Sequence, residues 1–267
     1  MSYDWSFFDN IRCINLITRD DRYQQAKSIF ERYNIPVEFY RTERHPNGGR
    51  QGCFESHINC LTEAYESGAN TCLVFEDDLE VSNYITPEAI GEVVKFLTKC
   101  PDWDIFYLGT HYEFVRGHFH KVTPSIIKGG NICTHSYVAS RRFMEKIANM
   151  KYVGTEIDRL YVYNRNAYGV YPSFFYQGGS KSDISDSVWD DFSGKWFWFR
   201  GVELYTYNVN QPLIVLLALL LLAVIALYIV NPQYRFIVLI AAIIIIIICL
   251  FVSSGYPQNA SVDDIAW

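Results

Sequence analysis

Apolar residues follow one pattern up to about residue 200 and a different pattern beyond it. In the first part, short apolar runs rich in β-branched and aromatic residues alternate with stretches whose apolar residues lie three or four positions apart. Short runs of this kind predict strands, and the wider spacing predicts helices. Strands are expected at 11–17, 36–40, 71–75, 104–109 and 136–139, a late extended segment at 170–176, and helices at 21–33, 53–65, 87–97, 141–148 and 157–163.

This alternation predicts an α/β domain over residues 1–200, with a mostly parallel sheet and helices on both of its faces. In sheets of this type, ligands bind beyond the carboxyl ends of the strands. Residues that directly follow a predicted strand are therefore the first candidates for a functional site.

Beyond Pro212 the chain becomes strongly apolar. The runs Pro212–Val230 and Phe236–Val252 contain no charged residue, and each is close to the roughly 20 residues that cross a bilayer as a helix. The sequence therefore predicts a transmembrane helical hairpin at 212–252, with a juxtamembrane linker at 201–211 and a short tail at 253–267. A buried helix pair in a soluble protein is the alternative, but such helices keep a polar stripe that these runs lack.

Residues outside the hairpin bear on its placement in a membrane. Trp196–Phe199 lies between Lys195 and Arg200, and aromatic residues beside cations suit the headgroup zone. The chain does not begin with a basic stretch followed by an apolar one, so no signal peptide is expected. We therefore expect the soluble domain on the cytosolic face of an internal membrane, although Arg235 between the two runs argues the other way.

Composition excludes several classes of function. The net charge is −6 and no basic stripe is present, so a nucleic-acid partner is not expected. The seven cysteines are scattered and show neither a disulfide framework nor paired metal spacing, which suits a reducing compartment. A serine hydrolase is not expected either, because the nucleophile elbow is missing.

Three consecutive acids, Glu76, Asp77 and Asp78, directly follow the apolar run Cys72–Phe75; we call them the acidic triplet. Adjacent carboxylates repel one another, and aspartate is unfavourable in strands. A divalent cation is the usual compensation, and Mg²⁺ and Mn²⁺ prefer carboxylate oxygens. The alternative is a solvated turn. The place of the triplet, beyond the carboxyl end of a strand, favours a site.

Several motifs occur in a fixed order around the acidic triplet. They are INLITRDDR (Ile14–Arg22), GCFESH (Gly52–His57), the triplet itself and QGGSKSDI (Gln177–Ile184). This ordered set resembles glycosyltransferase family 25, and the resemblance covers about residues 11–184. It implies a GT-A type, Rossmann-like fold and an inverting transfer of a hexose, galactose or glucose, from a UDP-sugar with Mn²⁺ or Mg²⁺. The acceptor would be a glycan, a lipid or a protein, and the hairpin would add a membrane anchor that is not part of the family pattern.

The resemblance and the chemistry of the side chains suggest roles for the acids. Asp78 is expected to bind the metal, and Glu76 or Asp77 to contact the ribose or a metal-bound water. Asp183 is a candidate second metal ligand, with His135 as the alternative.

The arginine pair and the histidine motif are expected to contact the donor. Arg19 and Arg22 suit phosphate oxygens, with Asp21 between them to fix their geometry or to contact the base. Ser56 and His57 are further donor-binding candidates. The alternatives are an exposed helix start for the arginines and a satisfied buried histidine for His57.

Inversion requires a general base that deprotonates the acceptor hydroxyl. Asp158 is the first candidate and Glu156 the second; a helix cap or an ion pair with Arg159 is the alternative for Asp158. Three other functions compete with the enzyme: a degenerate sugar- or nucleotide-binding scaffold, a metal-dependent phosphohydrolase and a membrane pore. The phosphohydrolase usually needs more histidine ligands, and the pore needs polar residues inside its spans.

Overall fold

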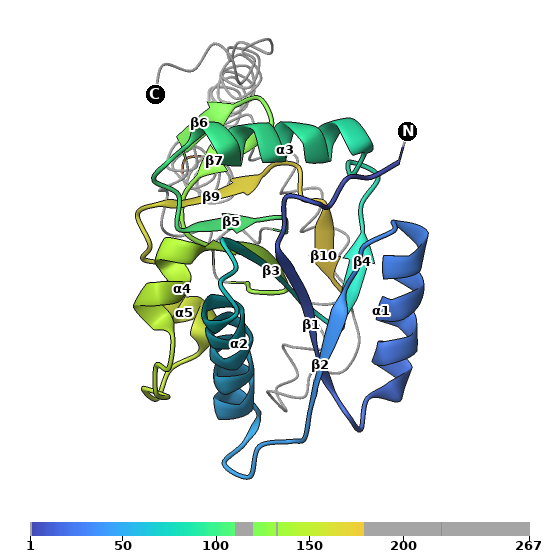
Figure 1. Ribbon diagram of the computed structural model, residues 1–267, viewed down its shortest axis with the longest axis vertical. Coiled ribbons are helices and arrows are strands. Elements are labelled where there is room, and N and C mark those ends of the chain that lie inside the picture. The colour runs from blue at the N-terminus through green and yellow to red at the C-terminus, as the bar shows by residue number, and fades with distance from the viewer. Residues whose placement is uncertain (1, 110–119, 132, 179–219, 221–267) are drawn as a thin grey trace, which may run out of the picture. The chain divides into compact units, whose positions relative to one another are not determined.

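The computed structural model describes residues 2–109, 120–131, 133–178 and Leu220. Strands and helices alternate from β1 to β3, and the order is less regular after β3 (Figure 1). In chain order they are β1 (Asn10–Leu16), α1 (Asp20–Arg32), β2 (Glu38–Thr42), α2 (Gly49–Glu66), β3 (Thr71–Glu76), β4 (Leu79–Val81), α3 (Pro87–Lys99), β5 (Ile105–Tyr107), β6 (His120–Thr123), β7 (Ile126–Lys128), β8 (Ser136–Ser140), α4 (Arg141–Ile147), α5 (Ile157–Tyr161), β9 (Ala167–Val170) and β10 (Phe175–Gln177).

The main sheet contains eight strands in the order β2-β1-β3-β8-β5-β9-β7-β6. β1 pairs in parallel with β2 and β3, and β5 pairs in parallel with β9. β8 and β7 run against the other strands. A second, two-stranded sheet joins β10 and β4 in antiparallel register.

Each predicted strand and helix is present, with bounds shifted by a few residues. The prediction of a mixed α/β fold is confirmed, and the pairing is less uniformly parallel than predicted because β8 enters between β3 and β5 in the opposite direction. The short strands β4, β6 and β7 were not predicted, and the late extended segment divides into β9 and β10.

Two hydrophobic cores cover the two faces of the sheet. α1 and α3 pack on one face, where Phe30 and Phe96 are buried. α2, α4 and α5 pack on the other, where Leu61 and Met144 are buried. The helices therefore cover both faces, as the sequence predicts.

Strand β3 shows how this arrangement follows from the sequence. Leu73 and Phe75 point into the core under α1 and α3, whereas Cys72 and Val74 point into the core under α2 and α4. A strand that is buried on both faces has a continuous apolar sequence rather than an alternating one. The acidic triplet begins where this double burial ends.

The direction of β8 brings distant residues next to the triplet. Phe75 of β3 pairs with Ser136 of β8, and the backbone N–H of Glu76 donates to the carbonyl of His135 at 2.9 Å. The amino end of β8 therefore meets the carboxyl end of β3 at the edge of the sheet that carries the acids.

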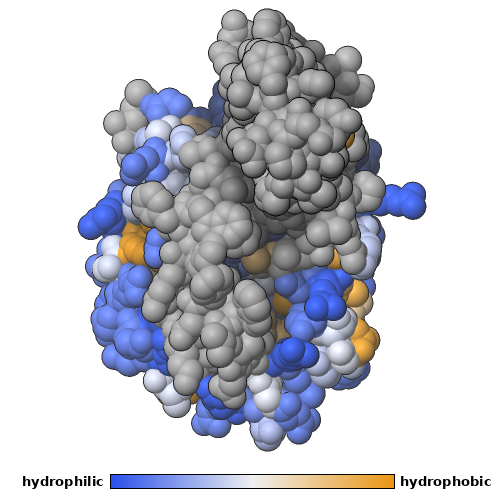
Figure 2. All heavy atoms as spheres, turned by 180° about the vertical axis from the view of Figure 1, so that it is seen from behind, coloured by the Kyte–Doolittle hydropathy of each residue, from blue (hydrophilic) through white to orange (hydrophobic). Residues whose placement is uncertain are grey.

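The predicted hairpin at 212–252 lies outside the described residues, apart from Leu220. The same is true of the linker, the tail and the boundary of the first domain near residue 200. Among the helices that the structure does describe, none is long and apolar enough to cross a membrane. On the face shown in Figure 2, the coloured surface is mainly hydrophilic, with scattered hydrophobic residues.

The end of β5 allows no side chain at Gly109. A Cβ atom there would lie 2.0 Å from Nε2 of His135 and 2.4 Å from the carbonyl oxygen of Phe175. Gly109→Ala is therefore expected to cost about 1–3 kcal/mol of unfolding free energy or more, measured as a lower melting temperature.

Gly91 provides the matched control for this substitution. It lies inside α3, and a Cβ atom there would have no neighbour within 4 Å. Gly91→Ala is expected to stabilise the protein by about 0.5–1 kcal/mol, because alanine favours a helix interior. Equal melting temperatures for the two variants would contradict the close packing at Gly109.

Candidate active site

A pocket that is partly open to solvent lies beyond the carboxyl ends of β1, β2 and β3. Its lining combines the acidic triplet with residues of β1, of the segment after β2, of α1, of α2 and of β10. The lining residues are Ile14, Leu16, Arg22, Thr42, Glu43, Arg44, His45, Gly49, Gly52, Cys53, Ser56, His57, Glu76, Asp77, Asp78 and Gln177.

Asp77 is held by side chains from β1 and α1. Its Oδ2 accepts a hydrogen bond of 2.6 Å from Nδ2 of Asn15, and its Oδ1 accepts one of 3.0 Å from Nη1 of Arg22. Burial raises the pKa of Asp77, although Asn15 and Arg22 act in the opposite direction. Both carboxylate oxygens are thus engaged within the protein, and Asp77 braces the site.

Asp78 differs from Asp77 because one of its carboxylate oxygens has no hydrogen-bond partner among the described residues. Its Oδ2 lies 3.3 Å from Nε2 of Gln177 and 3.4 Å from Nη1 of Arg22. Its Oδ1 is buried and has no hydrogen-bond partner among the described residues. Burial, together with the charge of Glu76, raises the pKa of Asp78 to about 7. A buried carboxylate oxygen without a partner fits a hard divalent cation.

Glu76 points to the other side of β3, toward α2. Its Oε1 accepts a hydrogen bond of 2.9 Å from Oγ1 of Thr134 and lies 3.4 Å from Nε2 of His57. Burial opposes ionisation of this carboxyl group, but the contacts with His57, His135 and Thr134 lower its pKa below the usual value. Glu76 is therefore an ionised group beside the buried His57.

The first turn of α2 brings a positive helix end to the pocket. The helix begins after Gly48, whose φ of +104° favours glycine, and no side chain caps it. No acidic residue lies in the first turn, while Gly49 and Gly52 line the pocket. An uncapped helix start of this kind favours an anion.

Arg19 and Asp21 are not brought into the pocket. They form a two-pronged pair with each other, with both N···O distances 3.0 Å, and Asp21 is exposed. Arg22, one turn further, is buried between Asp77 and Asp78. Ser56 lines the pocket, and its hydroxyl donates to the carbonyl of Gly52 at 2.7 Å.

The two candidate bases lie at the start of α5 and have different surroundings. Glu156 forms ion pairs with Arg50 at 3.3 Å and with Arg159 at 3.0 Å. Asp158 accepts a hydrogen bond from the backbone N–H of Arg159 at 2.6 Å. Burial, assisted by the charges of Glu156 and Glu76, raises the pKa of Asp158 to about 6.

Asp183 and His135 are the candidates for a further metal ligand. Asp183 lies outside the described residues. His135 is buried, and its Nε2 lies 3.1 Å from the carbonyl oxygen of Phe175. Because a carbonyl only accepts, this nitrogen carries the proton. Burial lowers the pKa of His135.

Several residues near the acids received no role from sequence reasoning, among them Asn15, Cys53, Gln177 and Thr134. Asn15, Cys53 and Gln177 lie inside the motifs named above, so their presence there was a usable signal. Thr134 opens the stretch THSYVASRR, but its role was not predicted because only the antiparallel entry of β8 brings it to Glu76.

Two solved structures are similar to parts of the chain at low identity. The crystal structure of A197 from STIV is 13% identical, with a TM-score of 0.36 over 62% of this chain and 83% of that one. Mannose-1-phosphate geranyltransferase from Thermus thermophilus is 11% identical, with a TM-score of 0.32 over 59% of this chain and 58% of that one. These likenesses are too weak to carry the assignment.

A family comparison is more specific. Residues 41–161 match the model of glycosyltransferase family 25, described as an LPS biosynthesis protein. The matched span contains α2, the acidic triplet and Asp158. On this match, residues 41–161 form a glycosyltransferase family 25 domain, and the protein is a glycosyltransferase.

Proposed function

We propose that this enzyme transfers a hexose, galactose or glucose, from a UDP-sugar to a glycan, lipid or protein acceptor, with inversion and with a divalent metal ion. The observation that carries the proposal is the buried Oδ1 of Asp78, which has no hydrogen-bond partner in the described part of the chain, in a pocket that Arg22 also lines. An anion-binding helix start lies in the same pocket.

The nucleotide diphosphate would lie between the start of α2 and the acidic triplet. Arg22 and the uncapped first turn of α2 supply positive electrostatic potential, and phosphate groups bind favourably at such positions. Ile14 and Leu16 form an apolar wall at the end of β1, which suits the flat face of a base.

The metal would be held by Asp78, with Asp183 as a proposed second ligand. The site accepts a hard cation because Asp78 offers an oxygen that no described group satisfies. A bound Mn²⁺ or Mg²⁺ would supply positive charge that stabilises the departing diphosphate. Asp77 keeps Arg22 in place beside Asp78.

Asp158 would remove the proton from the acceptor hydroxyl. A base that works near neutral pH needs a pKa close to the operating pH, and the raised pKa of Asp158 meets this need better than an ordinary aspartate. Glu156 is a weaker candidate because two arginines pair with it.

The direct test incubates the purified full chain, in detergent, with a panel of UDP-sugars, with and without Mn²⁺, and measures the release of UDP. Metal-dependent release from UDP-galactose or UDP-glucose, stimulated by added acceptor, is expected. The absence of both release and metal-dependent UDP binding across the panel would contradict the proposal and would favour a binding scaffold.

We also propose that the hairpin at 212–252 anchors the enzyme and leaves its catalytic domain on the cytosolic face of an internal membrane. Protease treatment of sealed membranes should then digest the domain without detergent. Protection that ends only when detergent is added would place the domain on the other side.

A further inference from the structure

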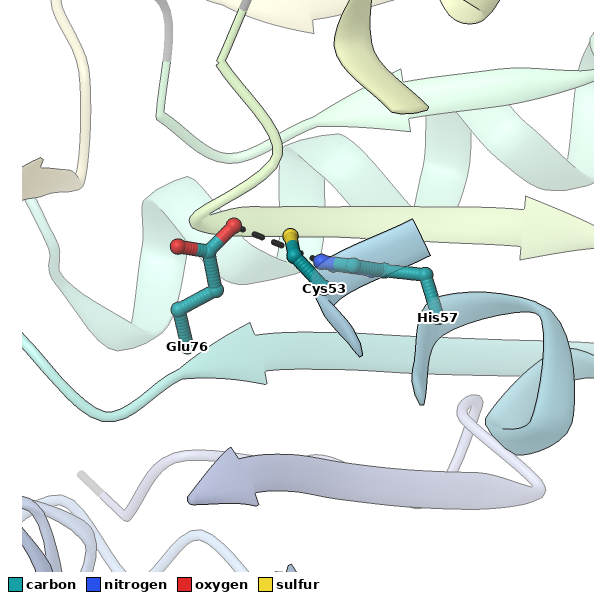
Figure 3. Close-up of side chains that lie close together, drawn as sticks. All are labelled: Cys53, His57 and Glu76. Carbon is teal, nitrogen blue, oxygen red and sulfur yellow. Dashed lines mark ion pairs between the residues drawn. The ribbon is translucent and has the colours of Figure 1, made fainter. Parts of the chain in front are cut away.

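Three potential ligands of a thiophilic metal converge on the α2 side of the pocket. Cys53 and His57 lie four residues apart on α2 and project from the same side of the helix, whereas Glu76 ends β3, as Figure 3 shows. Their Sγ, ring nitrogen and carboxylate oxygen all lie within 4.8 Å of one another. We propose that Cys53, His57 and Glu76 form a second metal site, distinct from Asp78 and selective for Zn²⁺ or a similar soft divalent ion.

The distances agree with tetrahedral coordination. Nitrogen and oxygen ligands at zinc lie about 2.0–2.2 Å from the ion, so two of them at a tetrahedral angle are roughly 3.3–3.6 Å apart. Nε2 of His57 and Oε1 of Glu76 are 3.4 Å apart. The Sγ atom of Cys53 would have to move on the order of 1 Å to reach tetrahedral distances from the other two ligand atoms.

Two of the ligands already have the supporting contacts that metal ligands require. Nδ1 of His57 lies 3.0 Å from the hydroxyl of Tyr137, which leaves Nε2 directed at Glu76. Thr134 donates to Glu76 at 2.9 Å. Hydrogen bonds of this kind fix the ring orientation and the tautomer of a metal-binding histidine.

A second observation points to a ligand at this position. His57 is fully buried, and its Nε2 makes no regular hydrogen bond among the described residues; it faces Oε1 of Glu76 at 3.4 Å. Such a nitrogen normally finds a partner. The three residues line the pocket, so an ion can reach them, and three protein ligands leave a fourth position for water or a substrate oxygen.

The types of ligand atom distinguish this site from the proposed Mn²⁺ or Mg²⁺ site. Thiolate and imidazole select soft and borderline ions, whereas carboxylate oxygens alone suit hard ions. The Cys53 thiol is not a candidate nucleophile, because burial raises its pKa well above the usual range. Metal ligation is the chemistry that its neighbours support.

Co²⁺ tests this site without a need for activity. The full chain is titrated with Co²⁺ in detergent and excess Mg²⁺, and the near-ultraviolet charge-transfer band of a cobalt–thiolate bond is recorded. One equivalent of Co²⁺ should produce the band, and Zn²⁺ should bleach it. Cys53→Ala should abolish it.

Cys60→Ala is the matched control. Cys60 is a buried thiol on the same helix, outside the cluster, and its variant should keep the band. Melting temperatures verify that both variants are folded, and Glu76→Gln should weaken the band without removing a thiol. A missing band in the parent chain, a band that survives in Cys53→Ala, or one lost equally in Cys60→Ala overturns the proposal. Asp78→Asn should keep the band, which separates this result from the fate of the proposed function.

Discussion

Asp78→Asn is expected to lower Mn²⁺-dependent UDP release by about 10²–10³-fold, because it removes a negative charge from the residue that we propose binds the metal beside the diphosphate. The amide has nearly the same shape as the carboxylate, so the buried pocket should keep its packing. Oδ2 of Asp78 contacts Gln177 and Arg22. Oδ1 has no hydrogen-bond partner among the described residues and is the atom that we propose binds the metal. Initial rates measured across a Mn²⁺ titration would quantify the loss.

Asp102→Asn is the control for this substitution. The Asp102 side chain is 77% exposed and pairs with Arg142 at 3.2 Å, ahead of the amino end of β5, away from the pocket lining. Its rate should stay within about twofold of the parent, because exposed ion pairs contribute little. A rate for Asp78→Asn that also stays within that range would contradict the proposal that Asp78 binds the metal.

Asp158→Asn is expected to lower kcat by about 10²–10⁴-fold with little change in the binding of the donor, since a general base contributes this much to a proton transfer. Rates at saturating donor and Mn²⁺, with the acceptor varied, would measure the effect. Glu156→Gln is the informative comparison. If Glu156→Gln suffers the larger loss instead, the two acids exchange their roles.

The pH profile provides a second measure of Asp158. A base acts in its deprotonated form, and the pKa of Asp158 is raised to about 6. The parent enzyme should therefore lose activity as the pH falls through about 6 and reach a plateau above it. Asp158→Asn should lack this dependence. If Asp158→Asn still loses activity as the pH falls through about 6, another group causes that loss.

The acidic triplet could be placed from sequence because its signal is local. An apolar strand buried on both faces, followed at once by three acids, defines both the edge of the sheet and the position of the carboxylates. The same logic located α2 and its motif residues, and the family match agrees with that assignment.

The side chains that contact the acidic triplet could not be predicted from local sequence patterns. A strand pattern does not reveal whether the strand runs parallel or antiparallel, so the entry of β8 and the contact of Thr134 with Glu76 could not be anticipated. Arg19 and Arg22 looked equivalent in sequence, but only Arg22 faces the triplet. The helical spacing of Cys53 and His57 was visible, whereas their approach to Glu76 required the packing of α2 on β3.

The side chains that hold the acidic triplet and the residues that line one wall of the pocket come from different parts of the chain. Side chains from β1, α1 and the turn before β8 hold the acids, whereas residues 42–45 form one wall of the pocket. Substitutions along that wall can reshape the space for a donor while the carboxylates keep their partners. If the UDP-sugar binds in this pocket as we propose, donor preference can change in single steps during evolution while the acids keep their positions.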